Sequence, residues 1–318
     1  MLGTSGKIES VALVGLGAIG CAYLGKISKI LPLSSIQVVA EGERATRYKK
    51  SGIILNGRRI DFPIVGRNEL RHADLLIFTV KFNQLEEAIQ LASEAVGPDT
   101  VVISLLNGIT SEEVIAAAYG WDKVLYSLSL GIDATRYGDN TTVTVYGVIP
   151  FGEARNTPGA YSDKVLRLKN FFDRVHIHSE IPEDMRLALW RKFMLNVGVN
   201  QTSAIIGSTY GALQVDGAAR GIAVSAMREV VKLSRYEGVT LGEQDIAQAM
   251  TVMETLSPGG KCSMLQDIEA CRPTEVAIFG GTVLALAEKH GVATPVNDML
   301  VRLIGAKEEI FEREKNQR

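Results

Sequence analysis

The chain has 318 residues, with 34 lysines and arginines against 36 aspartates and glutamates, and 46% of its residues are hydrophobic. This length predicts two domains, each large enough to bury a core. The formal net charge of −2 excludes nucleic acid and an anionic membrane surface as partners. The absence of any run of roughly 18–20 apolar residues excludes insertion into a membrane. The N-terminal segment MLGTSGKIES lacks an apolar core of signal-peptide length, so we expect a soluble cytoplasmic protein.

The first half of the chain alternates short apolar runs with helical patterns, which is typical of parallel βαβ units. The apolar runs are nearly continuous in Val, Ile and Leu, as a sheet covered on both faces requires. They predict strands at 11–14, 36–40, 74–80 and 100–105, with helices at 18–30 and 82–96. We therefore expect an N-terminal α/β domain with a Rossmann-type parallel sheet.

The pattern changes after residue 124, where 126–130 and 141–152 alternate polar and apolar residues as antiparallel or edge strands do. A helix at 163–173 and a strand at 175–178 follow. The remainder has mostly helical periodicity, with amphipathic stretches at 183–199, 217–237, 243–256 and 275–290. The composition shift near Pro182 predicts two domains, a Rossmann domain at 1–182 and an all-α domain at 183–318, whose polar tail EREKNQR is expected to fray.

A GxGxxG motif lies directly after the first predicted strand and opens the first predicted helix. Gly15 permits a tight turn, Gly17 lets the backbone approach a pyrophosphate, and Gly20 lets the helix pack closely on the sheet. The helix N-terminus offers N–H groups and a positive dipole end to phosphates. The alternative, an ordinary glycine-rich turn, does not require this strand–turn–helix context. The predicted cofactor loop is Gly15, Leu16, Gly17, Ala18, Ile19 and Gly20.

An acidic residue, Glu41, follows the second predicted strand, 21 positions after Gly20. A carboxylate there accepts hydrogen bonds from the adenosine ribose and repels a 2′-phosphate, which favours NAD(H) over NADP(H). The neighbouring Arg44 and Arg47 are able to pair with a 2′-phosphate instead, or to form a solvated loop cluster. These residues leave the choice between the two cofactors open.

Polar residues at two further strand ends are candidate ligand contacts. Lys81 follows the strand at 74–80, and Asn107 and Gly108 follow the strand at 100–105. Open α/β sheets bind their ligands at the carboxyl ends of such strands.

The helical half contributes a polar stripe and a polar segment. Lys192, Asn196 and Asn200 lie four residues apart in an otherwise apolar helix, so they share one face, which either meets solvent or lines a cleft. A partly desolvated lysine there would have a lowered pKa suited to proton donation.

The later segment KCSMLQDIEACRPTEVAIFGG holds Ser263, Asp267, Arg272 and Glu275. Pro273 predicts that a helix starts beside Glu275, and a role as a helix cap alone would also explain the acidic residue at this position.

The cysteines and histidines are sparse. Cys21, Cys262 and Cys271 match no metal or redox spacing and are expected to be reduced. His176 and His178 would share one face of the strand predicted at 175–178, but no further ligand completes a shell. We expect no metal site.

Five segments together resemble the ketopantoate reductase (2-dehydropantoate 2-reductase) family: GLGAIG, TVKFNQ, LNG, LWRKFMLNVGVNQTSA and SMLQDIEACRPTE. The resemblance spans almost the whole chain and implies a Rossmann domain and an all-helical domain with the active site between them. It also implies NADPH-dependent reduction of 2-dehydropantoate, a small 2-oxo acid, to (R)-pantoate on the route to pantothenate and coenzyme A. The apolar helical faces are compatible with a homodimer.

The resemblance assigns roles to individual residues. Lys192 corresponds to the family's general acid, Glu275 to the acidic residue that holds the substrate hydroxyl, and Ser263 to a contact of the substrate carboxylate. The residues that correspond to the lining of the substrate and nicotinamide pocket are Asn107, Asn196 and Asn200, with Lys81 near the nicotinamide end.

Some positions depart from the family pattern. Glu41 stands where members that use NADPH usually have arginine, Leu106 replaces a common glutamine, and Ala277 and Gly280 replace an aspartate and part of an Asn-Gly pair. These departures resemble the NAD-dependent D-2-hydroxyacid dehydrogenases of the same fold, such as D-mandelate dehydrogenases, which form the alternative hypothesis. A non-catalytic dinucleotide-sensing protein is a third hypothesis, but it gives no reason to retain Lys192, Ser263 and Glu275.

Overall fold

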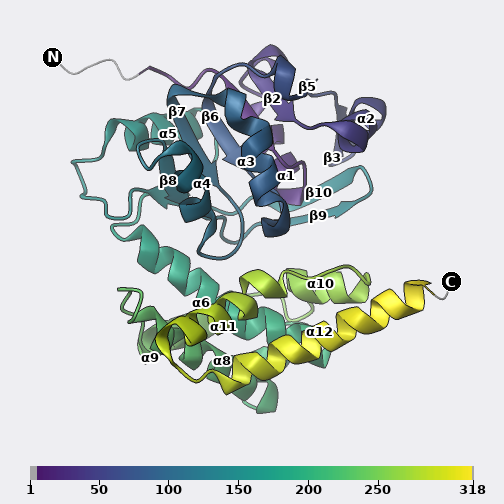
Figure 1. Cartoon of the computed structure of the whole chain (residues 1–318), viewed down its shortest axis with the longest axis vertical. Coiled ribbons are helices and arrows are strands. Elements are labelled where there is room, and N and C mark those ends of the chain that lie inside the picture. The colour runs from purple at the N-terminus through teal and green to yellow at the C-terminus, as the bar shows by residue number, and fades with distance from the viewer. Residues whose placement is uncertain (1–5, 317–318) are drawn as a thin grey trace. The chain divides into compact units, whose positions relative to one another are not determined.

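A computed structural model describes residues 6–316 of the chain. Contacts within it divide the chain into two compact units, Met1–Arg186 and Leu187–Arg318 (Figure 1). The first five residues of the N-terminal segment and the last two of the polar tail lie outside the described residues.

The first unit is built on an eight-stranded sheet with strand order β12-β11-β8-β7-β6-β1-β2-β5. Neighbouring strands are parallel from β5 through β8, β11 is antiparallel to β8, and β12 is parallel to β11. This arrangement confirms the predicted α/β fold with its mainly parallel sheet. The strands are β1 (Val11–Val14), β2 (Ile36–Val39), β5 (Ile64–Val65), β6 (Ala73–Phe78), β7 (Val96–Ser104), β8 (Val124–Ser127), β11 (Ile149–Gly152) and β12 (Ser179–Glu180).

Helices cover both faces of this sheet, because successive strand residues point to opposite sides and both sides are apolar. Val11 and Leu13 of β1 belong to a core that includes α1 (Ala18–Ile27) and α5 (Asp163–Arg174). Ala12 and Val14 belong to a core that includes α3 (Leu85–Ala92) and α4 (Ser111–Tyr119), which Figure 1 shows in front of the sheet. The α3 segment is flanked by the short 3₁₀ turns η3 (Phe82–Gln84) and η4 (Ser93–Ala95), where one continuous helix was predicted.

A second, four-stranded sheet with order β4-β3-β10-β9 was only partly predicted. The hydrophobic pattern indicated β10, but β3 and β4 have only three residues each, too few to produce a period. Leu55 and Val143 of this sheet pack on Ala22 of α1. The elements are β3 (Ile53–Leu55), β4 (Arg58–Ile60), β9 (Asp133–Tyr137) and β10 (Asn140–Val145), preceded by α2 (Gly42–Ser51).

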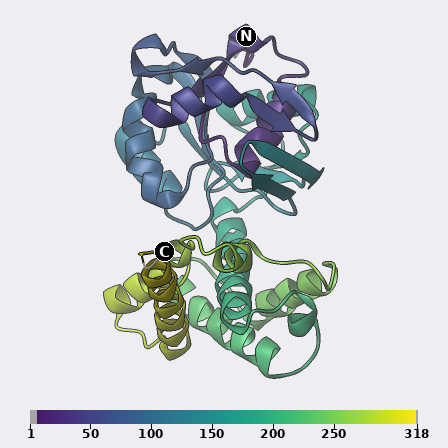
Figure 2. The same cartoon turned by 90° about the vertical axis from the view of Figure 1, so that its right-hand side faces the viewer.

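The described residues of the second unit form helices and no strands, which confirms the predicted all-α region (Figure 2). Buried Glu229 accepts hydrogen bonds from the backbone N–H groups of Val296 and Asn297, both at 2.9 Å, and so anchors the start of the last helix. The helices are α6 (Met185–Ile206), α7 (Gly211–Gln214), α8 (Ala218–Ser234), α9 (Glu243–Glu254), α10 (Ser263–Glu269), the 3₁₀ turn η5 (Val276–Ile278), α11 (Gly280–His290) and α12 (Pro295–Asn316).

Three local predictions were wrong. The strand predicted at 175–178 lies instead at 179–180, and His176 has a left-handed φ of 56°, so the two histidines do not share the face of a strand. The helix predicted from residue 275 begins as the 3₁₀ turn η5 and becomes α-helical only at Gly280. The described part of the polar tail continues α12 to Asn316, where fraying was expected. Within residues 6–316, no helix is both long and apolar enough to span a bilayer.

Candidate active site

The carboxyl ends of the central strands form one edge of the large sheet. Val14 of β1 is in register with Val39 of β2 and Phe78 of β6, and Phe78 is in register with Ser104 of β7. Consequently the glycine loop, Glu41, Lys81 and Asn107 all follow strands that end at the same level. The structure places the polar residues of the first unit at this edge, where parallel sheets bind ligands.

The glycine loop is shaped by the end of β6. Gly15 has a φ of +100°, and a Cβ added to it would lie 2.7 Å from the Thr79 carbonyl. A Cβ on Gly20 would lie 2.2 Å from the Gly15 carbonyl oxygen and 2.6 Å from Thr79 Oγ1. Thr79 Oγ1 donates a hydrogen bond to the carbonyl of Gly15 and so fixes the turn. Glycine at these two positions is therefore demanded by the internal packing of the chain.

Gly17 is different, because its own surroundings leave room for a side chain. It precedes α1 with φ −75°, and a Cβ there would have only the Thr79 carbonyl oxygen within 4 Å, at 3.9 Å. The first turn of α1 contains no acidic residue, and no side chain caps it. An open backbone surface at a helix N-terminus fits the pyrophosphate of a dinucleotide. The glycine loop therefore leaves the backbone at Gly17 accessible, as a GxGxxG motif for a dinucleotide requires.

This difference gives a direct test of the loop. We expect Gly17→Ala to keep the melting temperature of the wild type but to weaken binding of NADH or NADPH by about tenfold or more, because a methyl group would occupy the phosphate position. Isothermal titration calorimetry measures the affinity and thermal unfolding measures the stability. The matched control, Gly221→Ala on α8, has open space at the Cβ; it should leave the cofactor affinity unchanged and raise the melting temperature slightly, because alanine replaces glycine inside a helix. A Gly17→Ala protein that binds the cofactor like the wild type contradicts the assignment.

Glu41 lines a cavity of about 490 Å³ just beyond β2. Its Oε1 accepts a hydrogen bond of 2.7 Å from the backbone N–H of Arg67, which holds the exposed carboxylate at the cavity wall. Arg44 lines the same cavity, whereas Arg47 lines a different one beside Glu43. The cavity beside Glu41 is therefore lined by an acidic side chain and by the basic side chains of Arg44 and Arg67, and Arg47 does not line it.

Two arginines near this edge were missed by sequence reasoning. Arg67 lines the Glu41 cavity, and its guanidinium donates a hydrogen bond of 3.3 Å to Ser93 Oγ. Arg136 reaches from β9 to donate a hydrogen bond to the carbonyl of Leu16 in the glycine loop. Neither arginine belongs to a sequence motif, because each contacts residues that are distant in the sequence. Their positive charge was the only sequence feature that could have indicated a role near this edge.

Lys81 and Asn107 begin the loops after β6 and β7. Lys81 is exposed and immediately precedes the 3₁₀ turn η3, and Asn107 is half-buried in the turn before α4. A buried polar network lies beneath the Asn107 turn: Ser104 Oγ and Ser111 Oγ are 2.8 Å apart, and Ser111 Oγ donates to Glu112 at 2.9 Å. This network ties β7 to the first turn of α4 and so holds the intervening loop.

The second unit presents the predicted polar stripe on α6. Burial increases along it, from half-buried Lys192 and Asn196 to Asn200, which is buried. Trp190 and Phe193, on other faces of the helix, are 4% and 1% exposed. Thus α6 is not an outer helix with a solvated face, and its stripe lies at a partly shielded surface.

Two later segments are connected to this helix. The Cys262 thiol caps α10 by accepting from the Leu265 N–H, and it lies 3.8 Å from the Asn200 carbonyl oxygen. Burial raises the pKa of Cys262, so the thiol stays protonated and inert. Ser263, the next residue, is exposed at the start of α10. The structure therefore brings the Ser263 segment to the Asn200 end of the stripe.

Glu275 immediately precedes η5, and the chain before it is anchored to α12. The Thr274 N–H donates to Glu308 Oε1 at 2.7 Å, and Thr274 Oγ1 accepts from the Val276 N–H at 3.2 Å. Asp267 and Arg272, the other polar residues of this segment, form an ion pair of 2.8 Å with each other. This pairing gives both a structural role and leaves Ser263 and Glu275 as the ligand candidates.

No group of three or more histidine, cysteine, aspartate or glutamate side chains within residues 6–316 is arranged to hold a metal ion. The candidate groups that remain are an open glycine loop and polar side chains at the sheet edge in the first unit, and an ammonium, two amides, a hydroxyl and a carboxylate in the second. An ammonium and amide donors suit the stabilisation of negative charge on an oxygen atom.

Comparisons with known proteins agree with these features. Residues 11–156 match the family described as Ketopantoate reductase PanE/ApbA, and residues 184–308 match Ketopantoate reductase PanE/ApbA C terminal. A 2-dehydropantoate 2-reductase from Streptococcus pyogenes serotype M6 is 25% identical over 310 residues, which cover 95% of this chain and 98% of the relative.

Solved structures share the fold over 95% of this chain and 99% of theirs. The ternary structure of D-mandelate dehydrogenase with NADH and anilino(oxo)acetate has a TM-score of 0.83 at 22% identity. A dimeric ketopantoate reductase from Staphylococcus aureus has a TM-score of 0.75 at 21% identity. Together, the two family matches cover both halves of the sequence, and the chain belongs to the ketopantoate reductase family of oxidoreductases.

Proposed function

We propose that this protein reduces 2-dehydropantoate to (R)-pantoate with a reduced nicotinamide cofactor, as a step toward pantothenate and coenzyme A. The observation that carries this proposal is the α6 stripe, in which half-buried Lys192 is followed by Asn196 and buried Asn200 on one helical face. Family membership over both units and the name of the Streptococcus pyogenes relative support the choice of reaction.

The chain's own residues have distinct tasks in this reaction. A bound nicotinamide would supply a hydride to the carbonyl carbon of the substrate. Lys192 donates a proton from Nζ to the carbonyl oxygen as negative charge develops there, so the C=O becomes CH–OH. Asn196 and Asn200 orient the substrate, Ser263 contacts its carboxylate, and Glu275 accepts a hydrogen bond from its hydroxyl. Asn107 and Lys81 hold the nicotinamide end of the cofactor.

We further propose NADH as the preferred cofactor. Glu41 is fixed at the wall of its cavity by the Arg67 N–H, where its carboxylate accepts from ribose hydroxyls and repels a 2′-phosphate. The solved D-mandelate dehydrogenase of the same fold holds NADH. Use of NADPH, which the family resemblance implies, would require Arg44 and Arg67 to outweigh the carboxylate.

Steady-state kinetics test the proposal. Purified protein with 2-dehydropantoate and either reduced cofactor should oxidise that cofactor, with a higher kcat/KM for NADH. Absence of turnover with both cofactors, in a protein that is folded by circular dichroism, overturns the proposed function. Cofactor binding without turnover of any 2-oxo acid would indicate the dinucleotide-sensing alternative.

A D-2-hydroxyacid dehydrogenase is the second candidate, favoured by the residues after Glu275. Ala277 lies in η5, and a Cβ on Gly280 would lie 2.2 Å from Gln201 Oε1 and 2.3 Å from Val301 Cγ2. The packing of α11 on α6 and α12 therefore admits no side chain at Gly280. Packing within the unit therefore explains Gly280, and exposed Ala277, where the family pattern has an aspartate, is the departure that favours this candidate. A higher kcat/KM for a branched or aromatic 2-oxo acid than for 2-dehydropantoate would favour this candidate.

We also propose that the chain forms a homodimer, because the Staphylococcus aureus protein of the same fold is dimeric.

A further inference from the structure

Helix α12 has an apolar seam that faces outward. Met299, Leu303 and Ile310 are 56%, 42% and 51% exposed, and Ala306 between them is also exposed. They follow one another at steps of four, three and four residues, which is the repeat of a seam between two paired helices. By the rise of an α-helix, the seam extends about 17 Å.

A neighbouring face of α12, about 110° around the helix from the seam, already supplies its contact with the protein. Leu300 and Ile304 are 5% and 0% exposed, and α12 packs on α8 and α11. An amphipathic surface helix needs only one apolar stripe to pack on its own unit, so the exposed apolar area of this second stripe exceeds what that packing requires. Contiguous exposed apolar surface of this kind marks an interaction site.

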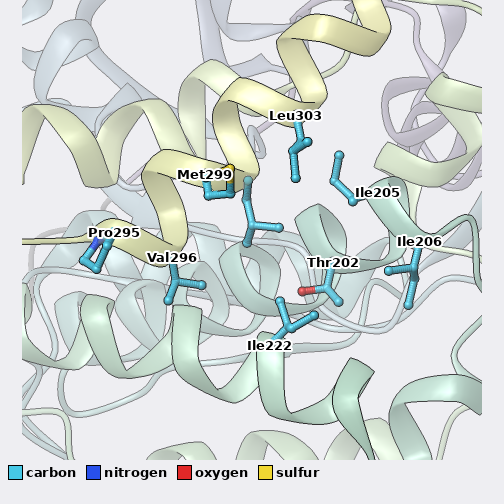
Figure 3. Close-up of a pocket in the computed structure, with 9 residues that line it drawn as sticks. Thr202, Ile205, Ile206, Ile222, Pro295, Val296, Met299 and Leu303 are labelled. Atoms are coloured by element: carbon cyan, nitrogen blue, oxygen red, sulfur yellow. The ribbon is translucent and has the colours of Figure 1, made fainter.

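A groove lies beside the seam. It encloses about 360 Å³ and lies between α6, α8 and α12. Figure 3 shows Met299 and Leu303 of α12 on one side, with Ile205 and Ile206 of α6 and Ile222 of α8 opposite. Ile206 and Ile222 are themselves 42% and 39% exposed, so the groove continues the apolar surface of the seam and provides space for an inserted aliphatic side chain.

The charges that flank the seam identify its partner. Arg302 directly precedes the seam residue Leu303, and Glu309 directly precedes the seam residue Ile310. Arg302 and Glu309 are seven residues apart, so they occupy equivalent positions on the same flank of the seam. In antiparallel helix pairs, equivalent flanking positions face each other, so Arg302 would meet the partner's Glu309, twice by symmetry. A parallel pair would instead place Arg302 against the partner's Lys307 and bring like charges together. The surface is thus complementary to itself in the antiparallel arrangement, as a two-fold dimer requires.

We infer that α12 pairs antiparallel with α12 of a second copy of this chain. This inference rests on the proposed homodimer and specifies its surface. Met299 then lies opposite the partner's Ile310, which fills the groove, and Leu303 lies opposite the partner's Ala306. Within one chain, the exposed ion pairs Arg302–Asp298 at 3.0 Å and Glu309–Arg313 at 3.6 Å are weak and can exchange for contacts across the interface.

Sedimentation velocity over a range of concentrations tests the surface. The wild type should be a dimer, and Leu303→Glu should raise the dimer dissociation constant by about 100-fold or more, because the charge would be buried at the centre of the seam. Val252→Glu is the matched control, since Val252 is 49% exposed on α9 and should leave the dimer intact. Circular dichroism verifies that each variant is folded. A wild-type monomer overturns both the inference and the homodimer, whereas a dimer insensitive to Leu303→Glu overturns only this surface.

Charge reversal tests the orientation. Arg302→Glu alone should weaken the dimer, and Arg302→Glu combined with Glu309→Arg should restore it, because the second change re-forms both pairs across the interface.

Cross-linking provides a check of the orientation that does not depend on the stability of the dimer. In a Cys271→Ser background, which removes the exposed thiol, Met299→Cys with Ile310→Cys should form intermolecular disulfides and Ile310→Cys alone should not. Efficient cross-linking of the single variant would show a parallel pair and overturn the inference. None of these changes touches the proposed catalytic residues, so turnover of 2-dehydropantoate tests the reaction independently.

Discussion

Replacing Lys192 with alanine is expected to lower kcat for 2-dehydropantoate by about 100- to 10,000-fold, the range for loss of a positioned general acid. The half-buried ammonium on α6 is the only cation of the α6 stripe, and the remaining amides cannot replace the proton that it donates. Lys192→Arg should also be inactive or nearly so, because a guanidinium keeps the charge but does not release a proton at neutral pH. Stopped-flow measurement of the first turnover separates this loss from an effect on product release.

The control for Lys192 is Lys232→Ala. Lys232 is exposed on α8, so its removal changes the charge of the same unit by the same amount without reaching the stripe. Its kcat should equal that of the wild type. A Lys192→Ala protein that keeps its rate would remove the proposed acid from the mechanism, and water or another donor would then have to protonate the carbonyl oxygen.

Replacing Glu41 with arginine is expected to shift the ratio of kcat/KM for NADH over NADPH by about 100-fold or more toward NADPH. Like charges at an interface cost several kcal/mol, and the substitution replaces a carboxylate by a cation at the proposed 2′-phosphate position. Glu41→Gln should give a smaller shift in the same direction, because the amide oxygen is still able to accept the 2.7 Å hydrogen bond from the Arg67 N–H. Initial rates with each cofactor at saturating substrate measure the ratio.

Glu43→Arg provides the matched comparison for Glu41. It makes the same change of charge two residues away, but Glu43 lines the neighbouring cavity rather than that of Glu41. Its cofactor ratio should stay within a few-fold of the wild type. Equal effects of the two substitutions would mean that the long-range field, and not contact with the ribose, determines cofactor choice. An unchanged ratio in Glu41→Arg would contradict the assignment altogether.

The features that sequence predicted well are local in the chain. Spacing alone identified the glycine loop, because a turn between a strand and a helix is built from neighbouring residues. The strands of the large sheet were found because burial on both faces imposes continuous apolar runs. Their ends were less accurate: β7 begins at Val96 rather than 100, and α1 ends at Ile27 rather than 30. Such boundaries depend on caps and neighbouring strands as much as on propensity.

The features that sequence missed depend on contacts between distant segments. Nothing near Arg136 in the sequence indicates that it bonds to the Leu16 carbonyl 120 residues away. Nothing near Glu41 indicates that the Arg67 N–H will hold it. His176 was assigned to a strand because its neighbours are apolar, but it adopts a left-handed φ where the chain leaves α5.

The sequence by itself determined the α/β and all-α organisation, the position of the glycine loop and the family, since periodicity and motif spacing are properties of the chain. Only the tertiary structure decided why Gly15 and Gly20 are required while Gly17 is open, because that depends on where Thr79 lies. It also decided which apolar stripe of α12 is covered: Leu300 and Ile304 are buried against other helices, whereas Met299, Leu303 and Ile310 remain exposed. Both stripes are equally apolar in sequence, and only packing distinguishes the core of one chain from a surface for a second.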